Sequence, residues 1–283
     1  METQRIKLRL AYDGTNFRGW ATQPGLRTVQ GELEAALALI FQQEIPLTVA
    51  GRTDAGVHAQ EQVAHCDIPT NGAGAPDKLQ NLPGRLEKIL KMRAHQANQP
   101  AGDIVIYQAE PVDPRFDARF SARSRSYSYQ LVDLRERRTP FQRAGVTWLE
   151  GDQELDISAM QEAAVDLLGE HDFLGYCKPR EGASTVRTLI VLDVIRHDSG
   201  VVEFKVQADA FCHSMVRSLV GALIRVGQGK EPVTYPRTIL AQASRDEAAP
   251  IAPPEGLRLA RIYYPETPEE WAEQAQRSRV YRG

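Results

Sequence analysis

A glycine-bounded segment of the chain holds one carboxylate and one guanidinium two residues apart. It reads GRTDAG from Gly51 to Gly56, and its glycines permit a tight turn and the close approach of a ligand. In locally extended backbone Arg52 and Asp54 point to the same side, and a nearby arginine favours the ionised form of a carboxyl group. Such an aspartate could act as a nucleophile. The alternative is an ordinary β-turn that caps its own backbone.

A second group of candidate residues combines aromatic rings with arginines. Tyr127 and Tyr129 lie on a predicted strand, within a stretch from Arg115 to Arg143 that holds eight arginines against three carboxylates, a local charge of +5. Aromatic rings among arginines suit stacking on the bases of single-stranded RNA and holding its phosphates. Alternatively, the tyrosines are half buried against a neighbouring strand and the arginines guard a solvated strand edge.

A third candidate is the polar side of a predicted helix over Val216–Val226. Arg217, Gly221 and Arg225 follow one another at four-residue spacing, so they share one face of that helix. These arginines could bind phosphates, or they could be solvated side chains whose stems cover apolar surface.

Two histidines, His58 and His65, do not have the spacing of a metal site. Seven positions and the start of a predicted strand separate them, and no clear set of further ligands completes a tetrahedral centre. Both are therefore predicted to be structural. The sequence also contains neither a G-x-x-x-x-G-K-(S/T) phosphate loop nor a dinucleotide fingerprint after a predicted strand, which argues against a nucleotide cofactor.

The composition is that of a folded, water-soluble protein. The 283 residues suffice for one large or two modest domains, and 42% hydrophobic and 25% charged residues argue against disorder, collagen and coiled-coil arrays. The longest apolar run, Ala35–Phe41, is too short to span a bilayer, and the N-terminus does not resemble a secretion signal. Cys66, Cys177 and Cys212 lie far apart, which predicts free thiols in a reducing cytoplasm. The net charge of −3 argues neither for nor against nucleic acid.

Hydrophobic periodicity predicts the order strand, helix, strand, strand, helix, strand in the first half of the chain. Thr28 can cap a helix whose apolar stripe runs from Val29 to Phe41. Residues 71–76 are predicted to form a loop. The other predicted elements are strands at Ile6–Ala11, Leu47–Ala50, Glu61–Ile68 and Ile104–Ala109, and a helix within Asp77–Arg93 that starts near Pro83.

The second half repeats this order. Asp156 can cap a helix that ends at Gly169, and HDSG at His197 predicts a hairpin. The remaining predicted elements are strands at Arg125–Val132, Thr188–Arg196, Val201–Ala210 and Leu257–Tyr264, and the helix Val216–Val226.

Two successive β-α-β-β-α-β units predict an α/β (α+β) protein of two ferredoxin-like halves, with a joined, mostly antiparallel sheet and a central basic cleft that houses Asp54. The halves share no evident sequence identity, so the pattern repeats and the residues do not. The predicted domains are an N-terminal half at 1–122, a C-terminal half at 123–267 and a polar tail at 268–283, either a terminal helix or disordered.

Several of these segments resemble the tRNA pseudouridine synthase A family, whose members isomerise uridines in the anticodon stem-loop. GRTDAGVHA, from Gly51 to Ala59, matches the signature of that family throughout, and Gln62-Val63 follows as in the family. The resemblance extends from about Leu8 to Pro265. Further similar segments are YDG at Tyr12, TVQ at Thr28, DARFSA at Asp117, YSY at Tyr127, LGEHDF at Leu168, MVR at Met215 and EGL at Glu255.

The resemblance implies a role for each candidate. Asp54 would be the essential catalytic aspartate, and Arg52 its charge partner and an aid to holding the target nucleotide out of its stack. Tyr127 would stack on the base and could take the C5 proton, while Arg217 and Leu257 would help complete the pocket. The implied reaction is glycosidic bond isomerisation at tRNA positions 38 to 40 without cofactor or metal, by a cytoplasmic homodimer that grips tRNA with both subunits.

One segment departs from the family pattern. The family commonly places Asn and then Leu-Pro before an Asp-Ile strand start, whereas residues 98–104 read NQPAGDI and lack the leucine. Two other functions use the same residues: a non-catalytic tRNA- or RNA-binding module, which would leave the RNA unchanged, and hydrolytic removal of uracil, which would leave abasic RNA. The sequence leaves open whether Asp54 attacks C1′, adds to C6 or removes a sugar proton.

Overall fold

The protein consists of two compact units. The computed structural model describes residues 2–70, 79, 81–178, 182, 184–244 and 248–280. The first unit contains the chain up to Arg123 together with Leu259–Val280, and the second contains Ser124–Arg258. The division after Arg123 lies next to the predicted boundary, and the last strand and helix return to the first unit.

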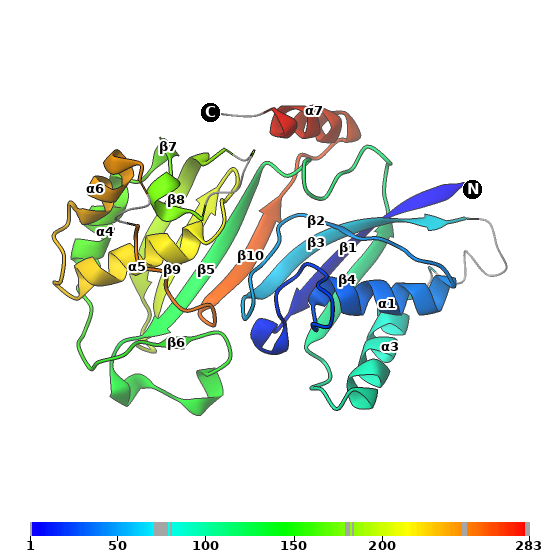
Figure 1. Cartoon of the computed structure of the whole chain (residues 1–283), viewed down its shortest axis with the longest axis horizontal. Coiled ribbons are helices and arrows are strands. Elements are labelled where there is room, and N and C mark those ends of the chain that lie inside the picture. Colours follow the sequence, from blue (N-terminus) through cyan, green and yellow to red (C-terminus); the bar gives the residue numbers. More distant parts are fainter. Residues whose placement is uncertain are drawn as a thin grey trace. The chain divides into compact units, whose positions relative to one another are not determined.

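The first unit contains most of the elements predicted for the N-terminal half (Figure 1). Its last strand, β10, begins with two residues that belong to the second unit. The elements are β1 (Thr3–Tyr12), η1 (Gly14–Asn16), α1 (Val29–Phe41), β2 (Thr48–Val49), β3 (His58–Pro69), α3 (Leu82–Gln96), β4 (Ile104–Pro111), β10 (Leu257–Tyr263) and α7 (Pro268–Arg279).

The strands of this unit pair antiparallel in the order β4-β1-β3-β2. This is the order of a ferredoxin-like sheet, in which the first and third strands are central. The alternation predicted for the first strand is confirmed, because Ile6, Leu8 and Leu10 are fully buried. On the other face, Lys7 pairs with Glu110 at 3.2 Å. The helices α1 and α3 pack against each other (Figure 1).

The Thr28 cap and the apolar stripe of α1 are also confirmed. The Thr28 side chain accepts a hydrogen bond from the backbone N–H of Gly31 at 3.2 Å, as expected of an N-cap residue. The stripe includes Leu33 and Leu37, both fully buried. This helix therefore forms one wall of the core that supports β1 and β3.

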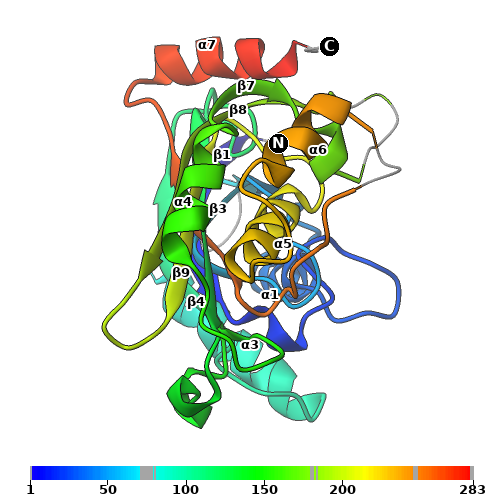
Figure 2. The same ribbon diagram turned by 90° about the vertical axis from the view of Figure 1, so that its left-hand side faces the viewer.

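The second unit follows the same plan with additional elements. Its helices α4, α5 and α6 pack against one another (Figure 2). The elements are β5 (Ser124–Val132), η2 (Arg135–Arg137), η3 (Pro140–Gln142), β6 (Thr147–Trp148), α4 (Ile157–Val165), β7 (Gly169–Asp172), η4 (Leu174–Tyr176), β8 (Val186–Arg196), β9 (Val202–Ala208), α5 (Met215–Gly227) and α6 (Tyr235–Gln242).

The strands β5, β9, β8 and β7 pair antiparallel in that order, and β6 adds a short parallel pair to β5. Tyr127 lies opposite Val206, and Tyr129 lies opposite Phe204. The mixed α/β class with mostly antiparallel strands is thus confirmed. Within the described residues, no helix has both the length and the apolar composition to cross a bilayer.

Some elements differ from the predictions. The second strand is only Thr48–Val49, and α6 and β7 were not predicted because each is too short to show a clear periodicity. The polar tail forms α7, whose Thr267 and Glu270 make a capping box. The predicted loop at 71–76 and the first residues of the helix predicted within Asp77–Arg93 lie outside the described residues.

The prediction of three free thiols is wrong for two of them. Cys177 and Cys212 form a disulfide, with their Cα atoms 5.7 Å apart. The two segments lie side by side because the backbone N–H of Lys178 donates to the carbonyl of His213 at 3.0 Å. A separation of 35 residues conceals such a neighbour from the sequence. Cys66 is free, and burial raises the pKa of its thiol to about 12.

Candidate active site

Asp54 lies in a loop between β2 and β3 whose backbone is tied down on both sides. The carbonyl of Asp54 accepts a hydrogen bond from the N–H of Val57 at 3.2 Å, which closes a turn. Immediately before it, the carbonyl of Thr53 accepts from the N–H of Trp20 at 3.0 Å. The loop is therefore more than a turn that caps itself, since a distant segment also holds it.

Glycines let that distant segment approach closely. A Cβ atom at Gly14 would collide with the carbonyl oxygen of Val57, and one at Gly19 would lie 2.8 Å from the carbonyl oxygen of Thr53. Gly19 also has a φ of +90°, a conformation that favours glycine. The YDG segment and the loop of Asp54 thus pack backbone against backbone, which explains why both belong to one pattern.

Arg52 and Asp54 differ in their surroundings. The Arg52 side chain is exposed and makes no ion pair or hydrogen bond within the part of the chain that the structure describes. Asp54 is partly exposed, and Thr53 between them is buried. The expected charge partnership is therefore not a direct contact here, and the guanidinium of Arg52 is open to a ligand.

Buried polar side chains support the loop from inside the first unit. Tyr12 on β1 and Gln62 on β3 reach it by hydrogen bonds. Sequence reasoning included both residues in the family pattern but assigned them no role. The signal was weak, because Gln60 and Glu61 precede Gln62 on the strand, and a glutamine needs buried hydrogen-bond partners only where its side chain turns inward.

His58 follows the loop and is structural, as predicted. Its Nδ1 atom lies 3.1 Å from the backbone N of Gly14, which donates to the neutral ring. The same atom lies 3.1 Å from Oδ1 of Asp13, an ion pair when the ring is protonated. Hydrogen bonds from His58 and Thr15 lower the pKa of Asp13 below its ordinary value.

His65 is structural as well. Its Nδ1 accepts a hydrogen bond from the backbone N–H of Ala118 at 3.0 Å, and its ring meets that of Phe116 edge to face. Burial lowers the pKa of His65, so the ring stays neutral near neutral pH.

The second unit holds the other candidate residues. Tyr127 on β5 is 9% exposed, and its ring meets Phe211 edge to face with 5.0 Å between the centroids. Tyr129 is fully buried, donating to or accepting from Oγ1 of Thr147 at 2.8 Å. Burial raises the pKa of Tyr129. Both tyrosines are therefore buried, and Tyr127 keeps a small exposed fraction that Tyr129 lacks.

Arg217 lies in the first turn of α5, where residues 250–252 cover the face expected to be solvated. Its Nε donates to the carbonyl of Ala252 at 2.6 Å, and the N–H of Ala252 donates to the carbonyl of Arg217 at 3.0 Å. A Cβ atom at Gly221 would collide with the carbonyl of Pro250. Arg225, the third member of the face, pairs with Glu231 at 2.8 Å.

The same covering segment leads to Leu257. The N–H of Leu257 donates to the carbonyl of Pro254 at 3.0 Å, and the side chain is buried. A Cβ atom at the preceding Gly256 would lie 2.5 Å from the carbonyl oxygen of Gln130 and 2.8 Å from Cζ of Tyr129. Leu257 is thus placed by close packing of its own loop on β5.

Carboxylates from outside the arginine-rich stretch at 115–143 pair with several of its arginines. Arg115 pairs with Asp113 and Glu269, and Arg123 pairs with Glu270. Three others are also bound within their units: Arg125 to the carbonyl of Asp209, Arg137 to Glu154, and Arg138 to the carbonyls of Leu149 and Gly151. Arg135 and Arg143 are exposed. The charge of +5 therefore overstates what this stretch offers to a phosphate backbone.

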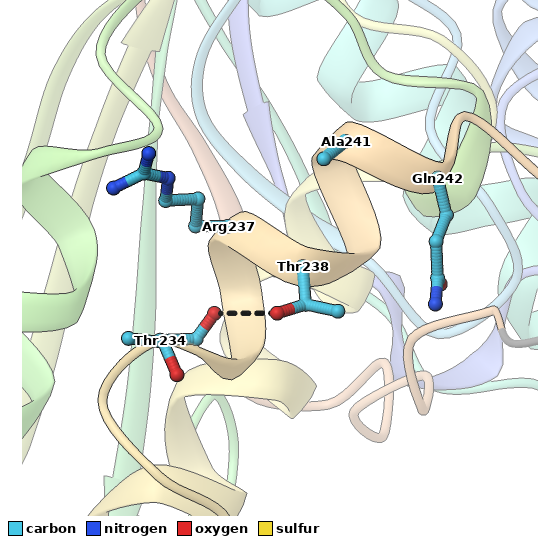
Figure 3. Close-up of a pocket in the computed structure, with 5 residues that line it drawn as sticks. All are labelled: Thr234, Arg237, Thr238, Ala241 and Gln242. Atoms are coloured by element: carbon cyan, nitrogen blue, oxygen red, sulfur yellow. Dashed lines mark hydrogen bonds between the residues drawn. The ribbon is translucent and has the colours of Figure 1, made fainter.

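A shallow surface pocket lies elsewhere on the second unit (Figure 3). One helix, α6, and its N-terminal flank supply its lining. Thr238 there donates its hydroxyl to the carbonyl of Thr234 at 3.1 Å, as Figure 3 shows. Among the described residues, its lining includes no aromatic ring and no carboxylate. The lining residues are Thr234, Arg237, Thr238, Ala241 and Gln242.

The chain is similar to known proteins over nearly its whole length. It is 48% identical over 266 residues to the tRNA pseudouridine synthase A of Frankia casuarinae, covering 94% of this chain and 91% of that protein. It is 45% identical to the enzyme of the same name from Cutibacterium acnes, covering 98% and 95%. A sequence model of the family described as tRNA pseudouridine synthase matches residues 163–265.

These similarities, together with the GRTDAGVHA loop, show that the protein is an isomerase that modifies RNA. The chain belongs to the tRNA pseudouridine synthase A family.

Proposed function

We propose that the protein converts uridines in the anticodon stem-loop of tRNA, at positions 38 to 40, to pseudouridine, with Asp54 as the catalytic residue. Family membership supports the tRNA substrate and the isomerase class. The observation that carries the role of Asp54 is its place in a loop whose backbone is held by hydrogen bonds at Thr53 and at Asp54 itself, while its own side chain is partly exposed. A carboxylate held in this way can act on a ligand without first being ordered.

The reaction needs no net change in composition. The glycosidic bond between N1 and C1′ breaks, the base turns while still held, and C5 bonds to C1′. The C5 proton leaves and N1 gains a proton, so the RNA keeps its mass. A carboxylate can capture or stabilise an oxocarbenium-like sugar, as in retaining glycosidases. The chemistry proposed therefore uses side chains of this chain alone, without cofactor or metal.

Each remaining candidate receives a role in holding the nucleotide. Extruding a base from its stack costs a few kcal/mol, which contacts in the protein must offset. Arg52, which is exposed, would bind the backbone of the extruded nucleotide. Tyr127 would stack on the base, backed by Phe211. Arg217 and Leu257 would complete the surroundings of the base.

Release of tritium from tRNA labelled at uridine C5 tests this function directly. The wild-type protein should release label and leave the RNA mass unchanged, whereas Asp54→Asn should release none. Salt-sensitive binding without release would instead indicate a non-catalytic RNA-binding module. Free uracil and abasic RNA would indicate hydrolysis. Mapping the modified positions in tRNA from cells that lack the protein tests the assignment to positions 38 to 40.

We also propose that the protein acts in the cytoplasm as a homodimer in which both subunits contact one tRNA. The support for both the location and the dimer is the family resemblance, and the family name gives tRNA as the substrate. The mass of the protein in solution, measured by light scattering, should be twice the 31.5 kDa of the chain. A mass of one chain, with activity intact, would contradict the dimer.

A further inference from the structure

We propose that Gln62 is a positioning residue, which holds the backbone before Asp54 through Gly51 and Tyr12. The inference rests on the proposed function, in which Asp54 performs the chemistry. Gln62 lies on β3, eight residues after Asp54, and touches no reacting group. Its contribution to the reaction would therefore act through the loop.

The Gln62 carboxamide lies wholly inside the first unit. The residue is 0% exposed. Its Nε2 donates to the carbonyl oxygen of Gly51 at 2.8 Å and to Oη of Tyr12 at 3.2 Å. An NH2 group has two hydrogens to donate, so these two acceptors use both. A buried amide costs stability unless its partners are present, and here one partner is the first residue of the catalytic loop.

Tyr12 extends this arrangement to the residue next to Asp54. Its Oη lies 2.7 Å from Oγ1 of Thr53. Because Tyr12 Oη accepts a hydrogen bond from Gln62, its own hydroxyl hydrogen can be donated in a hydrogen bond to Oγ1 of Thr53. Tyr12 is 4% exposed and Thr53 is 7% exposed, so water competes little for these bonds.

The arrangement fixes the loop at two points that flank Arg52. Gly51 is held by its carbonyl and Thr53 by its hydroxyl. Thr53 is also held by its carbonyl, which accepts from the N–H of Trp20. The position of the Asp54 backbone is therefore set by side chains from β1 and β3, and a shift of about 1 Å in a catalytic group can cost about 100-fold in rate.

Gln62→Met tests the inference, because methionine has a similar length and no donor. We expect kcat to fall about 10- to 100-fold, with KM for tRNA within about twofold of the wild-type value. Gln60→Met is the matched control, since Gln60 lies on the same strand and is exposed. It should leave kcat and KM unchanged.

A double variant separates positioning from general stability. Tyr12→Phe keeps the ring and removes the hydroxyl, so it breaks the same chain of hydrogen bonds as Gln62→Met. If these hydrogen bonds act together, the double variant should lose no more kcat than the worse single variant, because the second substitution breaks hydrogen bonds that the first has already removed. Independent, multiplying losses would contradict the inference.

The pH dependence of kcat in Gln62→Glu distinguishes a positioning role of Gln62 from a merely structural one. Its protonated form can donate one hydrogen bond, whereas its ionised form would face the carbonyl oxygen of Gly51. The kcat of this variant relative to the wild type should therefore fall as the pH rises. Thr53→Ser should retain kcat because it keeps the hydroxyl, and Thr53→Val should not.

The inference is overturned if Gln62→Met retains the wild-type kcat, or if KM rises as much as kcat falls. It is also overturned if the kcat of Gln62→Glu relative to that of the wild type does not change with pH. Failure of the proposed function looks different, since the wild type would then release no tritium or Asp54→Asn would release it fully. An active wild type and an inactive Asp54→Asn, together with an unaffected Gln62→Met, would reject the positioning role alone.

Discussion

Arg27 forms a two-pronged ion pair with Asp103, with Nη1 and Oδ2 2.6 Å apart and Nη2 and Oδ1 3.2 Å apart. The guanidinium also stacks over the ring of Phe17 at 4.2 Å. Phe17 in turn accepts a hydrogen bond from Gly56 in the loop of Asp54. The segment at 98–104, which departs from the family pattern, thus braces the loop through one carboxylate.

Asp103→Ala should lower the free energy of unfolding by about 2 to 3 kcal/mol, because it leaves a mostly buried guanidinium with only its longer contact to Glu32 at 4.0 Å. Tritium release should fall as well, since the brace of the loop is lost. Urea unfolding followed by fluorescence measures the first effect. Asp198→Ala, at an exposed hairpin residue, is the control and should change neither quantity.

Gly14→Ala should lower both the activity and the stability of the protein, because it displaces the loop of Asp54. The new methyl group would collide with the carbonyl of Val57 and push the loop of Asp54 away. We expect a loss of stability of about 1 to 3 kcal/mol and a fall in kcat of at least tenfold. Gly102→Ala has open space around its Cβ and should cost only its backbone strain. Equal kinetics for the two variants would contradict the close packing described.

The ionisation of Asp133 should make the stability of the second unit depend on pH. Its side chain is 0% exposed and pairs with Arg196 at 2.7 Å. Burial alone would raise the pKa of Asp133, but the hydrogen bonds from Arg196 and from the backbone N–H of Leu155, together with the positive charge of Arg196, outweigh burial and lower that pKa in the folded protein. As the pH falls, the carboxyl of Asp133 takes up a proton in the unfolded chain before it does so in the folded protein. The contribution of Asp133 to stability is therefore complete above the ordinary pKa of about 3.9 and is lost as the pH falls below that value.

Asp133→Asn should remove this part of the acid sensitivity and should also destabilise the protein at pH 7 by about 3 kcal/mol, because Arg196 loses its charge partner. Thermal unfolding at a series of pH values between 7 and 3 measures both effects. A variant whose stability falls as steeply with acid as that of the wild type would show that other carboxylates dominate. Asp198→Asn again serves as the exposed control.

Phe211→Ala should weaken catalysis by removing the edge-to-face support of Tyr127. An aromatic pair of this kind is worth about 0.5 to 1.5 kcal/mol, which corresponds to a loss of up to about tenfold in kcat/KM. Phe211→Tyr keeps the ring and should lose much less. If both variants match the wild type in steady-state kinetics, Phe211 does not support a base-stacking role for Tyr127.

The parts of the fold that were predictable are those that local pattern determines. The spacing of apolar residues alone predicts which side chains are buried in two places. These are the stripe of α1 that follows the Thr28 cap, and the alternating Ile6, Leu8 and Leu10. The repeated β-α-β-β-α-β order followed from these patterns, and the strand pairings within each unit confirm it.

The parts that were not predictable depend on neighbours distant in sequence. Arg115 looks like a free cation until Glu269 is found 2.8 Å away. Arg217 looks solvated until Ala252 covers it. Tyr127 and Tyr129 are equivalent by alternation, yet only the second is closed off by Thr147 and Gly256. Partners of this kind arise from tertiary packing, which periodicity does not encode.

The terminal helix α7 also limits how much positive charge the first unit presents at its surface. Its Glu269 and Glu270 hold Arg115 and Arg123, and its Trp271 covers the ring of Phe116. A chain shortened before α7 would uncover two cations and an aromatic ring together. Arg115 would keep only its pair with Asp113 and Arg123 would lose Glu270, so we expect the shortened chain to bind polyanions of any sequence more tightly than the full chain does.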